Sequence, residues 1–178
     1  EGVRIVLVSL LVCSVSAQVL DLNGMEWTLS NERGYNNVSI PGAVPGDSFT
    51  DLMTAGIIGD PYYRYNDMNY RWISLDNWTY TGNIELPSHS RVVLWFDGLD
   101  TIATVKINGE VIGKSDNMFR RWIYDFKSLL DSNKPEITIS IEFSSSASYA
   151  QQKADETEYI IPESTYQVRR YTNKPQVE

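Results

Sequence analysis

Few of the side chains that usually carry out catalysis occur in this chain of 178 residues. His89 is the only histidine, and it stands between two serines in Pro87-Ser88-His89-Ser90, a stretch typical of an exposed turn. A serine nucleophile needs a histidine base that is itself held by an acid. A histidine in a solvated turn does not meet that need, so we expect His89 to be a surface residue.

Thiol and metal chemistry find equally little support. Cys13 is the only cysteine, and it lies in an apolar N-terminal segment, so the sequence offers no disulfide and no cluster of thiolate ligands. Asp97-Gly98-Leu99-Asp100 lacks the rest of a calcium-binding loop and predicts a turn between strands. We therefore expect no cofactor and no metal, although a metal held by backbone carbonyls alone stays an open alternative.

Carboxylates are abundant, with 23 Asp and Glu against 15 Lys and Arg. A glycosidase needs two carboxyl groups on either side of the scissile bond, but no spacing here places one acid in an apolar pocket opposite another. We therefore assign no catalytic residue. The formal net charge of −8 also argues against nucleic acid or an anionic membrane as a partner, because both attract clustered Lys and Arg.

Aromatic residues are concentrated between positions 60 and 81 and alternate with charged and amide side chains. Sugars bind on aromatic faces whose neighbours can pair with hydroxyl groups. Aromatic residues of this kind also build cores and domain interfaces, and we favour that interpretation. The candidate interface or sugar-proximal residues are Asp60, Tyr62, Tyr63, Arg64, Asn66, Asp67, Trp72 and Trp78.

The first residues have the features of a secretory leader. Arg4 precedes an apolar run, and Val15-Ser16-Ala17 supplies small residues where a signal peptidase cleaves, so we expect residues 1–17 to be a signal peptide. The alternative is a buried N-terminal strand. Asn37-Val38-Ser39 and Asn77-Trp78-Thr79 are then candidate N-glycosylation sites, with Asn77 favoured because we expect it in an exposed turn.

The remaining pattern predicts an all-β, antiparallel jelly-roll sandwich. Residues 103–107 alternate apolar with polar and lead into an Asn108-Gly109 hairpin turn, which would set Ile112 opposite Val105. Residues 137–143 alternate likewise, and 92–96 form an apolar run expected of a strand buried on both faces. Further strands are predicted within 25–30, after a turn at 22–24, and over 38–40, 70–75, 78–86 and 122–126, with one short helix over 49–55 and a helical tendency over 149–158.

Several motifs together resemble one family. They are Pro41-Gly42-Ala43-Val44-Pro45-Gly46, the stretch 60–80 that begins Asp60-Pro61-Tyr62-Tyr63-Arg64, the stretch 98–103 running into Asn108-Gly109, and Asp116-Asn117-Met118-Phe119-Arg120-Arg121. Over about residues 22–162 the chain resembles the N-terminal, galactose-binding-like jelly-roll domain of animal lysosomal β-mannosidases in glycoside hydrolase family two.

The resemblance implies a non-catalytic domain or fragment, residues 18–163, of an enzyme that hydrolyses terminal β-linked mannose from glycoprotein oligosaccharides. The partners it implies are a separate catalytic barrel and, in the full-length enzyme, β-mannoside glycans. The implied location is the secretory pathway and lysosome, or alternatively outside the cell. The family's Trp-Asp-Trp-Gly-Pro loop does not occur in this sequence.

After Glu163 the likeness ends, and we interpret 164–178 as a divergent polar tail that is frayed or disordered. An incomplete gene model, a spliced form or a fragment would each explain this, and we expect the final strands of the sandwich to be missing. Two other roles stay open: a secreted carbohydrate-binding module that works alone, and a fragment with no independent role.

Overall fold

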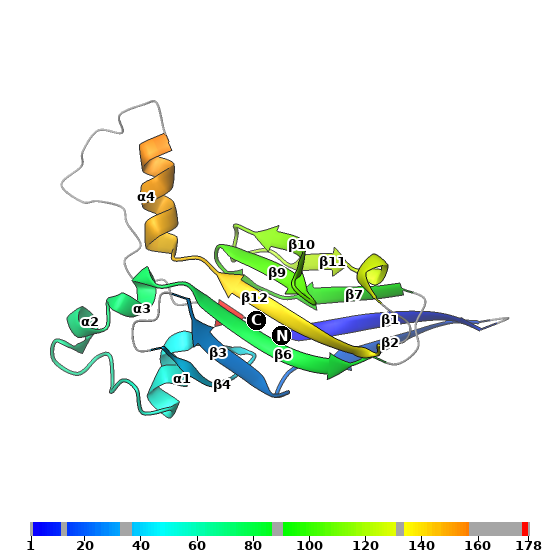
Figure 1. Cartoon of the computed structure of the whole chain (residues 1–178), viewed down its shortest axis with the longest axis horizontal. Coiled ribbons are helices and arrows are strands. Elements are labelled where there is room, and N and C mark those ends of the chain that lie inside the picture. Colours follow the sequence, from blue (N-terminus) through cyan, green and yellow to red (C-terminus); the bar gives the residue numbers. More distant parts are fainter. Residues whose placement is uncertain are drawn as a thin grey trace.

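The computed structural model describes residues 2–11, 14–32, 37–86, 91–130, 134–156 and 176–177. Two antiparallel sheets dominate it, which confirms the predicted all-β sandwich (Figure 1). The four-stranded sheet has the order β11 (Trp122–Asp125), β7 (Arg91–Phe96), β1 (Val3–Leu11), β2 (Ser14–Asp21). The six-stranded sheet has the order β10 (Glu110–Ser115), β9 (Ala103–Ile107), β12 (Glu136–Phe143), β6 (Trp78–Glu85), β3 (Trp27–Asn31), β4 (Ser39–Gly42).

The core lies between the two sheets and follows the alternation of the sequence. In β12 every second residue is buried and the intervening ones face outward. The same period appears in β3, β6, β7 and β9, because a strand covered on one face buries alternate side chains. The largest fully buried side chains are Trp78, Tyr80, Phe96, Phe126 and Phe143.

The hairpin β9–β10 turns at Asn108 and Gly109, as predicted, and both residues have a positive φ, of 50° and 85°. Its register differs from the prediction. A bulge between Val111 and Gly113 places Gly113, and not Ile112, opposite Val105. The ring of Tyr124 occupies the space beside Gly113, since a Cβ there would lie 2.0 Å from Cε1 of Tyr124. The bulge therefore occurs where β10 contacts Tyr124 of β11.

Strand β7 is buried on one face only, so the prediction of burial on both faces was wrong. Val92, Leu94 and Phe96 point into the core, whereas Val93 and Trp95 are half-buried on the outer face. An antiparallel sheet can leave one face without a second layer. The guanidinium of Arg121 lies over the Trp95 ring, 4.4 Å from its centroid, and covers part of it.

The N-terminal segment forms the hairpin β1–β2, with β1 hydrogen-bonded between β2 and β7. Val3 and Ile5 are fully buried in the core. The intact chain thus adopts the alternative arrangement named above, a buried N-terminal strand. Cleavage after Ala17 stays a prediction.

Helix α1 (Ser48–Thr54) was predicted, and the Asp47 side chain caps it by accepting hydrogen bonds from the amides of Phe49 and Thr50. The predicted strand over 70–75 was wrong, because α3 (Trp72–Leu75) lies there and follows α2 (Asn66–Asn69). Helix α4 (Ser146–Glu156) agrees with the helical tendency predicted over 149–158. The described residues also contain a 3-10 turn, η1 (Lys127–Leu129), so they hold more helices than the one short helix expected.

A small third sheet joins β5 (Gly46–Asp47), β13 (Gln176–Val177) and β8 (Leu99–Asp100). The pairing of Gln176–Val177 differs from the expected fraying of the tail, whose other residues lie outside the described part of the chain, as does His89. None of the helices in the described parts combines the length and the apolar character that a membrane span requires.

Candidate functional site

The predicted candidate residues lie at one end of the sandwich, where α1, α2 and α3 are grouped (Figure 1). We call residues 60–72 the aromatic segment. Three of its tyrosine rings face solvent: Tyr62 is 95% exposed, Tyr65 78% and Tyr63 58%. Such exposure is unusual for large side chains, and a group of them marks an interaction surface. Tyr65 was not among the predicted residues, although it stands in the same run.

Hydrogen bonds at its base hold the aromatic segment in shape. A side-chain oxygen of Asp60 accepts from the Tyr62 amide at 2.8 Å, and the Asn66 side-chain amide donates to the Asp60 carbonyl at 2.8 Å. The Gly59 amide donates to the Tyr70 hydroxyl at 2.9 Å. These bonds satisfy polar groups at the base of the segment, whereas the Tyr62 and Tyr63 rings stay exposed to solvent.

Charged groups lie among the exposed rings. Arg64 adopts a positive φ of 54° and sets its guanidinium 5.1 Å from the centroid of the Tyr63 ring. Asp60, Arg64 and Asp67 are exposed, and Asn66 is half-buried. The structure thus brings six of the eight predicted candidates into one surface that combines aromatic, cationic, acidic and amide groups.

The two tryptophans of the prediction differ from the rest. Trp78 is fully buried, and its indole N–H donates to the Ile73 carbonyl at 2.8 Å. Trp72 is half-buried and packs against Trp78 with a centroid separation of 5.9 Å. Trp78 is thus part of the core, one of the two roles favoured above for these aromatic residues, and it anchors α3 beneath the aromatic segment.

A second anchor connects α1 to the six-stranded sheet. The buried Asp51 carboxyl accepts from the Tyr80 hydroxyl at 2.9 Å and from the Ala43 amide at 3.1 Å. Burial raises the pKa of Asp51, against the opposing effect of the hydrogen bond from Tyr80. Burial and the neighbouring Asp51 carboxylate likewise raise the pKa of the Tyr80 hydroxyl. Both side chains are buried in the core, so the pair is structural.

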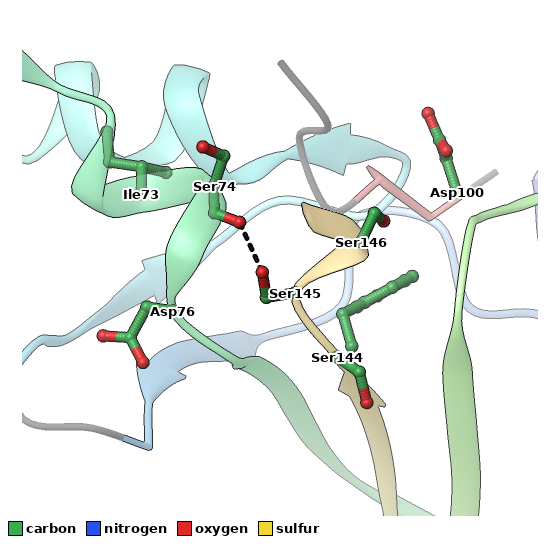
Figure 2. A pocket seen from close by; sticks show the side chains of 8 residues that line it. Ile73, Ser74, Asp76, Asp100, Ser144, Ser145 and Ser146 are labelled. Atoms are coloured by element: carbon green, nitrogen blue, oxygen red, sulfur yellow. Dashed lines mark hydrogen bonds between the residues drawn. The ribbon is translucent and has the colours of Figure 1, made fainter. Parts of the chain in front are cut away.

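A cluster of serines between α3 and α4 has the residue types of a hydrolase site but not its geometry (Figure 2). The cavity has a volume of about 10 Å³, which is room for about one water molecule and not for a sugar. The Ser145 hydroxyl donates to the Ser74 carbonyl at 2.8 Å and accepts from the Ser148 amide at 3.2 Å. Ser145 therefore caps α4 and is not an activated nucleophile.

The acidic side chains of the described residues give no metal centre. No group of three His, Cys, Asp or Glu in the described ranges could hold a metal ion. Asp97, in the predicted turn, accepts from the Gly2 amide, the Trp95 indole and the Arg121 guanidinium. Although partial desolvation acts in the opposite direction, these hydrogen bonds lower the pKa of Asp97, which is the carboxylate of a structural ion pair.

The two sequon asparagines occupy different environments. Asn37 is exposed and has a positive φ of 43°. Asn77 is half-buried immediately before β6, so its expected place in an exposed turn was wrong. Its side-chain oxygen accepts from the Ser145 amide at 2.9 Å, and its side-chain nitrogen donates to Glu32 at 2.5 Å.

The two antiparallel sheets define the class of this domain, an all-β sandwich. The family model described as "Glycosyl hydrolase 2 galactose-binding domain-like" matches residues 27–178. The chain belongs to that family.

Similar proteins agree with this assignment. A β-mannosidase of Rattus norvegicus is 39% identical over 155 residues, which cover 84% of this chain and 17% of the rat protein. A β-mannosidase of Bos taurus is 42% identical over 134 residues, or 72% of this chain and 15% of that protein. The crystal structure of a β-D-mannosidase from Dictyoglomus thermophilum aligns with a TM-score of 0.75 and 27% identity over 84% of this chain and 18% of that one. The chain thus spans about a sixth of the length of these proteins.

Proposed function

We propose that this chain is the N-terminal, non-catalytic part of a β-mannosidase whose full-length form removes terminal β-linked mannose from glycoprotein oligosaccharides. By itself the chain hydrolyses nothing. The observation that carries the proposal is the coverage: 84% of this chain aligns with the rat β-mannosidase, but that alignment takes up 17% of the rat protein. The catalytic residues of such an enzyme then belong to the remaining length.

The aromatic segment is the surface by which the domain packs against the rest of the enzyme. Its exposed rings, Tyr62, Tyr63 and Tyr65, have no partner layer among the described residues, and their neighbours include Arg64 and Asp67. Domain interfaces are enriched in tyrosine and arginine, since these side chains combine a large apolar area with polar groups. The partner is the catalytic barrel, and substrate is reached only in the complete enzyme.

The location that follows from this proposal is the secretory pathway and the lysosome. Cleavage of residues 1–17 and glycosylation at Asn37 and Asn77 belong to the same proposal. Expression of the natural chain with residues 1–17 intact, followed by N-terminal sequencing of the product, tests the leader. An uncleaved product retained in the cytosol would contradict it.

Activity assays test the central proposal. This chain and a longer form containing the catalytic part are compared on an aryl β-mannoside, and we expect turnover by the longer form alone. In the longer form Tyr62→Ala together with Tyr65→Ala should weaken domain packing and lower activity. Ile123→Ala is the matched control, because Ile123 is exposed on β11, outside the aromatic segment. Turnover by the short chain would refute the proposal.

The exposure of the same rings favours a second candidate, a secreted carbohydrate-binding module that works alone. It predicts glycan binding by the isolated chain, measured by calorimetry, and loss of binding in Tyr62→Ala or Tyr63→Ala without unfolding. Absence of binding to mannosides and to β-mannosyl oligosaccharides would eliminate it and leave the interdomain surface.

A further inference from the structure

A polar groove crosses the outer face of the six-stranded sheet, and no residue of the aromatic segment lines it. Its volume is about 360 Å³, within the range of about 300–1,000 Å³ that small-molecule sites occupy. Four strands contribute to its floor, because Ser30 pairs with Thr79, Thr79 with Glu142, and Glu142 with Thr104 across β3, β6, β12 and β9. We call it the hydroxyl groove.

The chemistry of the hydroxyl groove suits a polyhydroxylated occupant. In the part of the chain that the structure describes, the hydroxyls of Ser30, Thr79 and Thr104 have no hydrogen-bond partner. Lys106 and Glu142 form an ion pair at 2.6 Å along the floor and leave further donor and acceptor positions toward solvent. Donors and acceptors spaced along one surface match the hydroxyls of a sugar ring.

The groove contains both functional residues of the second sequon. Asn77 and Thr79 line it, whereas Trp78 between them points into the core. The side-chain nitrogen of Asn77 carries two hydrogens, and Glu32 accepts one of them. The other hydrogen is the one that an N-linked sugar replaces, so glycosylation is compatible with the bonds to Glu32 and to the Ser145 amide.

We propose that the hydroxyl groove seats the first N-acetylglucosamine of a glycan attached to Asn77, and that this sugar stabilises the sheet by bridging β3, β6, β12 and β9. A lipid-linked oligosaccharide diphosphate supplies the glycan. Its C1–O bond to the diphosphate breaks, the bond from C1 to the Asn77 side-chain nitrogen forms, that nitrogen loses one proton, and the lipid diphosphate leaves. The inference rests on the secretory route given under the proposed function.

Asn37 provides the internal comparison. It carries the other sequon and is exposed, but it does not line the hydroxyl groove. A glycan on Asn37 would therefore extend into solvent, and its removal should leave the stability of the sheet unchanged. Comparison of the two sites therefore distinguishes the effect of a sugar that bridges strands from the effect of a glycan that only adds bulk.

The experiment uses the whole chain expressed behind a host secretion signal, so that it does not depend on residues 1–17 acting as a leader. Thr79→Ala removes the sequon and keeps the Asn77 amide, Thr79→Ser keeps the sequon, and Ser39→Ala removes the sequon of Asn37. Intact mass before and after enzymatic deglycosylation gives occupancy. Trimming to a single N-acetylglucosamine isolates the first sugar, and the same variants from bacteria give the sugar-free baseline of each side chain.

We expect Asn77 to be modified in the wild type and in Thr79→Ser and unmodified in Thr79→Ala. The trimmed wild type should melt about 2–4 °C above its bacterial counterpart, and amides of β3, β6 and β12 should exchange more slowly. Thr104→Val removes one groove hydroxyl and should reduce this difference in melting temperature. Thr81→Val, on β6 but outside the groove, should not.

Two results would overturn the inference. One is an unmodified Asn77 in a chain whose Asn37 is modified. The other is a modified Asn77 with the same melting temperature and exchange rates as the bacterial protein. Neither result would contradict the proposed β-mannosidase function, because that function is tested separately by the activity of the longer form.

Discussion

Tyr80→Phe tests the anchor that holds α1 against the six-stranded sheet. The substitution keeps the ring, which packs edge-on against Phe143 at a centroid distance of 6.3 Å, and removes the hydroxyl that donates to Asp51. Both residues are buried, so water does not replace the lost donor. A hydrogen bond to a charged group contributes about 1.5–3 kcal/mol, and we expect a loss of about 2 kcal/mol in the free energy of unfolding at neutral pH.

The loss in free energy of unfolding caused by Tyr80→Phe should increase with pH. Burial raises the pKa of Asp51 above its unfolded value of 3.8, so the native state binds more protons in the window between the unfolded and folded values. The free energy of unfolding therefore falls as pH rises through that window. The bond from Tyr80 lowers the pKa of folded Asp51, and its removal extends the window upward. Tyr80→Phe should thus cost more at pH 7.5 than at pH 4.

Urea denaturation followed by tryptophan fluorescence measures the effect at both pH values. Tyr124→Phe is the matched control: its hydroxyl donates to the Lys114 carbonyl at 2.9 Å in an exposed setting, where the loss should stay below about 1 kcal/mol. An equal cost of Tyr80→Phe at pH 4 and pH 7.5, or a cost no larger than that of Tyr124→Phe, would refute the assigned role of the Asp51–Tyr80 pair.

Three further substitutions test the packing of the sandwich. Gly113→Ala places a methyl group within 2.0 Å of the Tyr124 ring and should cost about 1–3 kcal/mol in urea denaturation, whereas an unchanged stability would mean that the bulge adapts freely. Ser145→Ala removes the cap of α4 and should lose about 1–2 kcal/mol and part of the helical circular dichroism, with the exposed Ser144→Ala as control. Gly109→Ala forces a Cβ onto a φ of 85° and should cost about 1 kcal/mol, and no change in melting temperature would argue against the observed turn.

Local sequence patterns predicted much of the sandwich because each acts over a few residues. The alternation in β12 and the Asn108-Gly109 turn have short-range causes, and both are confirmed. The bulge at Gly113 was missed, since the space beside it belongs to Tyr124, which no pattern in the hairpin reveals. Residues 70–75 were predicted as a strand but contain a helical turn. In that turn Trp72 packs against Trp78, and the Ile73 carbonyl accepts a hydrogen bond from the Trp78 indole.

The candidate surface was predictable in composition but not in orientation. The density of aromatic residues indicated the segment, whereas the exposure of Tyr62 and Tyr65 depends on a turn closed by Asp60 and Asn66. The same limit applies to the sequons. Both are visible as motifs, but the burial of Asn77 beside Glu32 depends on strands that pair across some 45 residues.

The exposed aromatic segment is held in place by residues of the core. Trp78 and Tyr80 are fully buried on β6, and their polar atoms bind the Ile73 carbonyl and the Asp51 carboxyl. These bonds fix α3 and α1, which flank a segment whose Tyr62, Tyr63 and Tyr65 rings are exposed. A surface of exposed rings that is held rigidly loses little conformational entropy when it is covered. On the proposed function, the domain supplies the longer enzyme with a preorganised face for a partner. Buried side chains beneath that face, Trp78 and Tyr80, hold it in position.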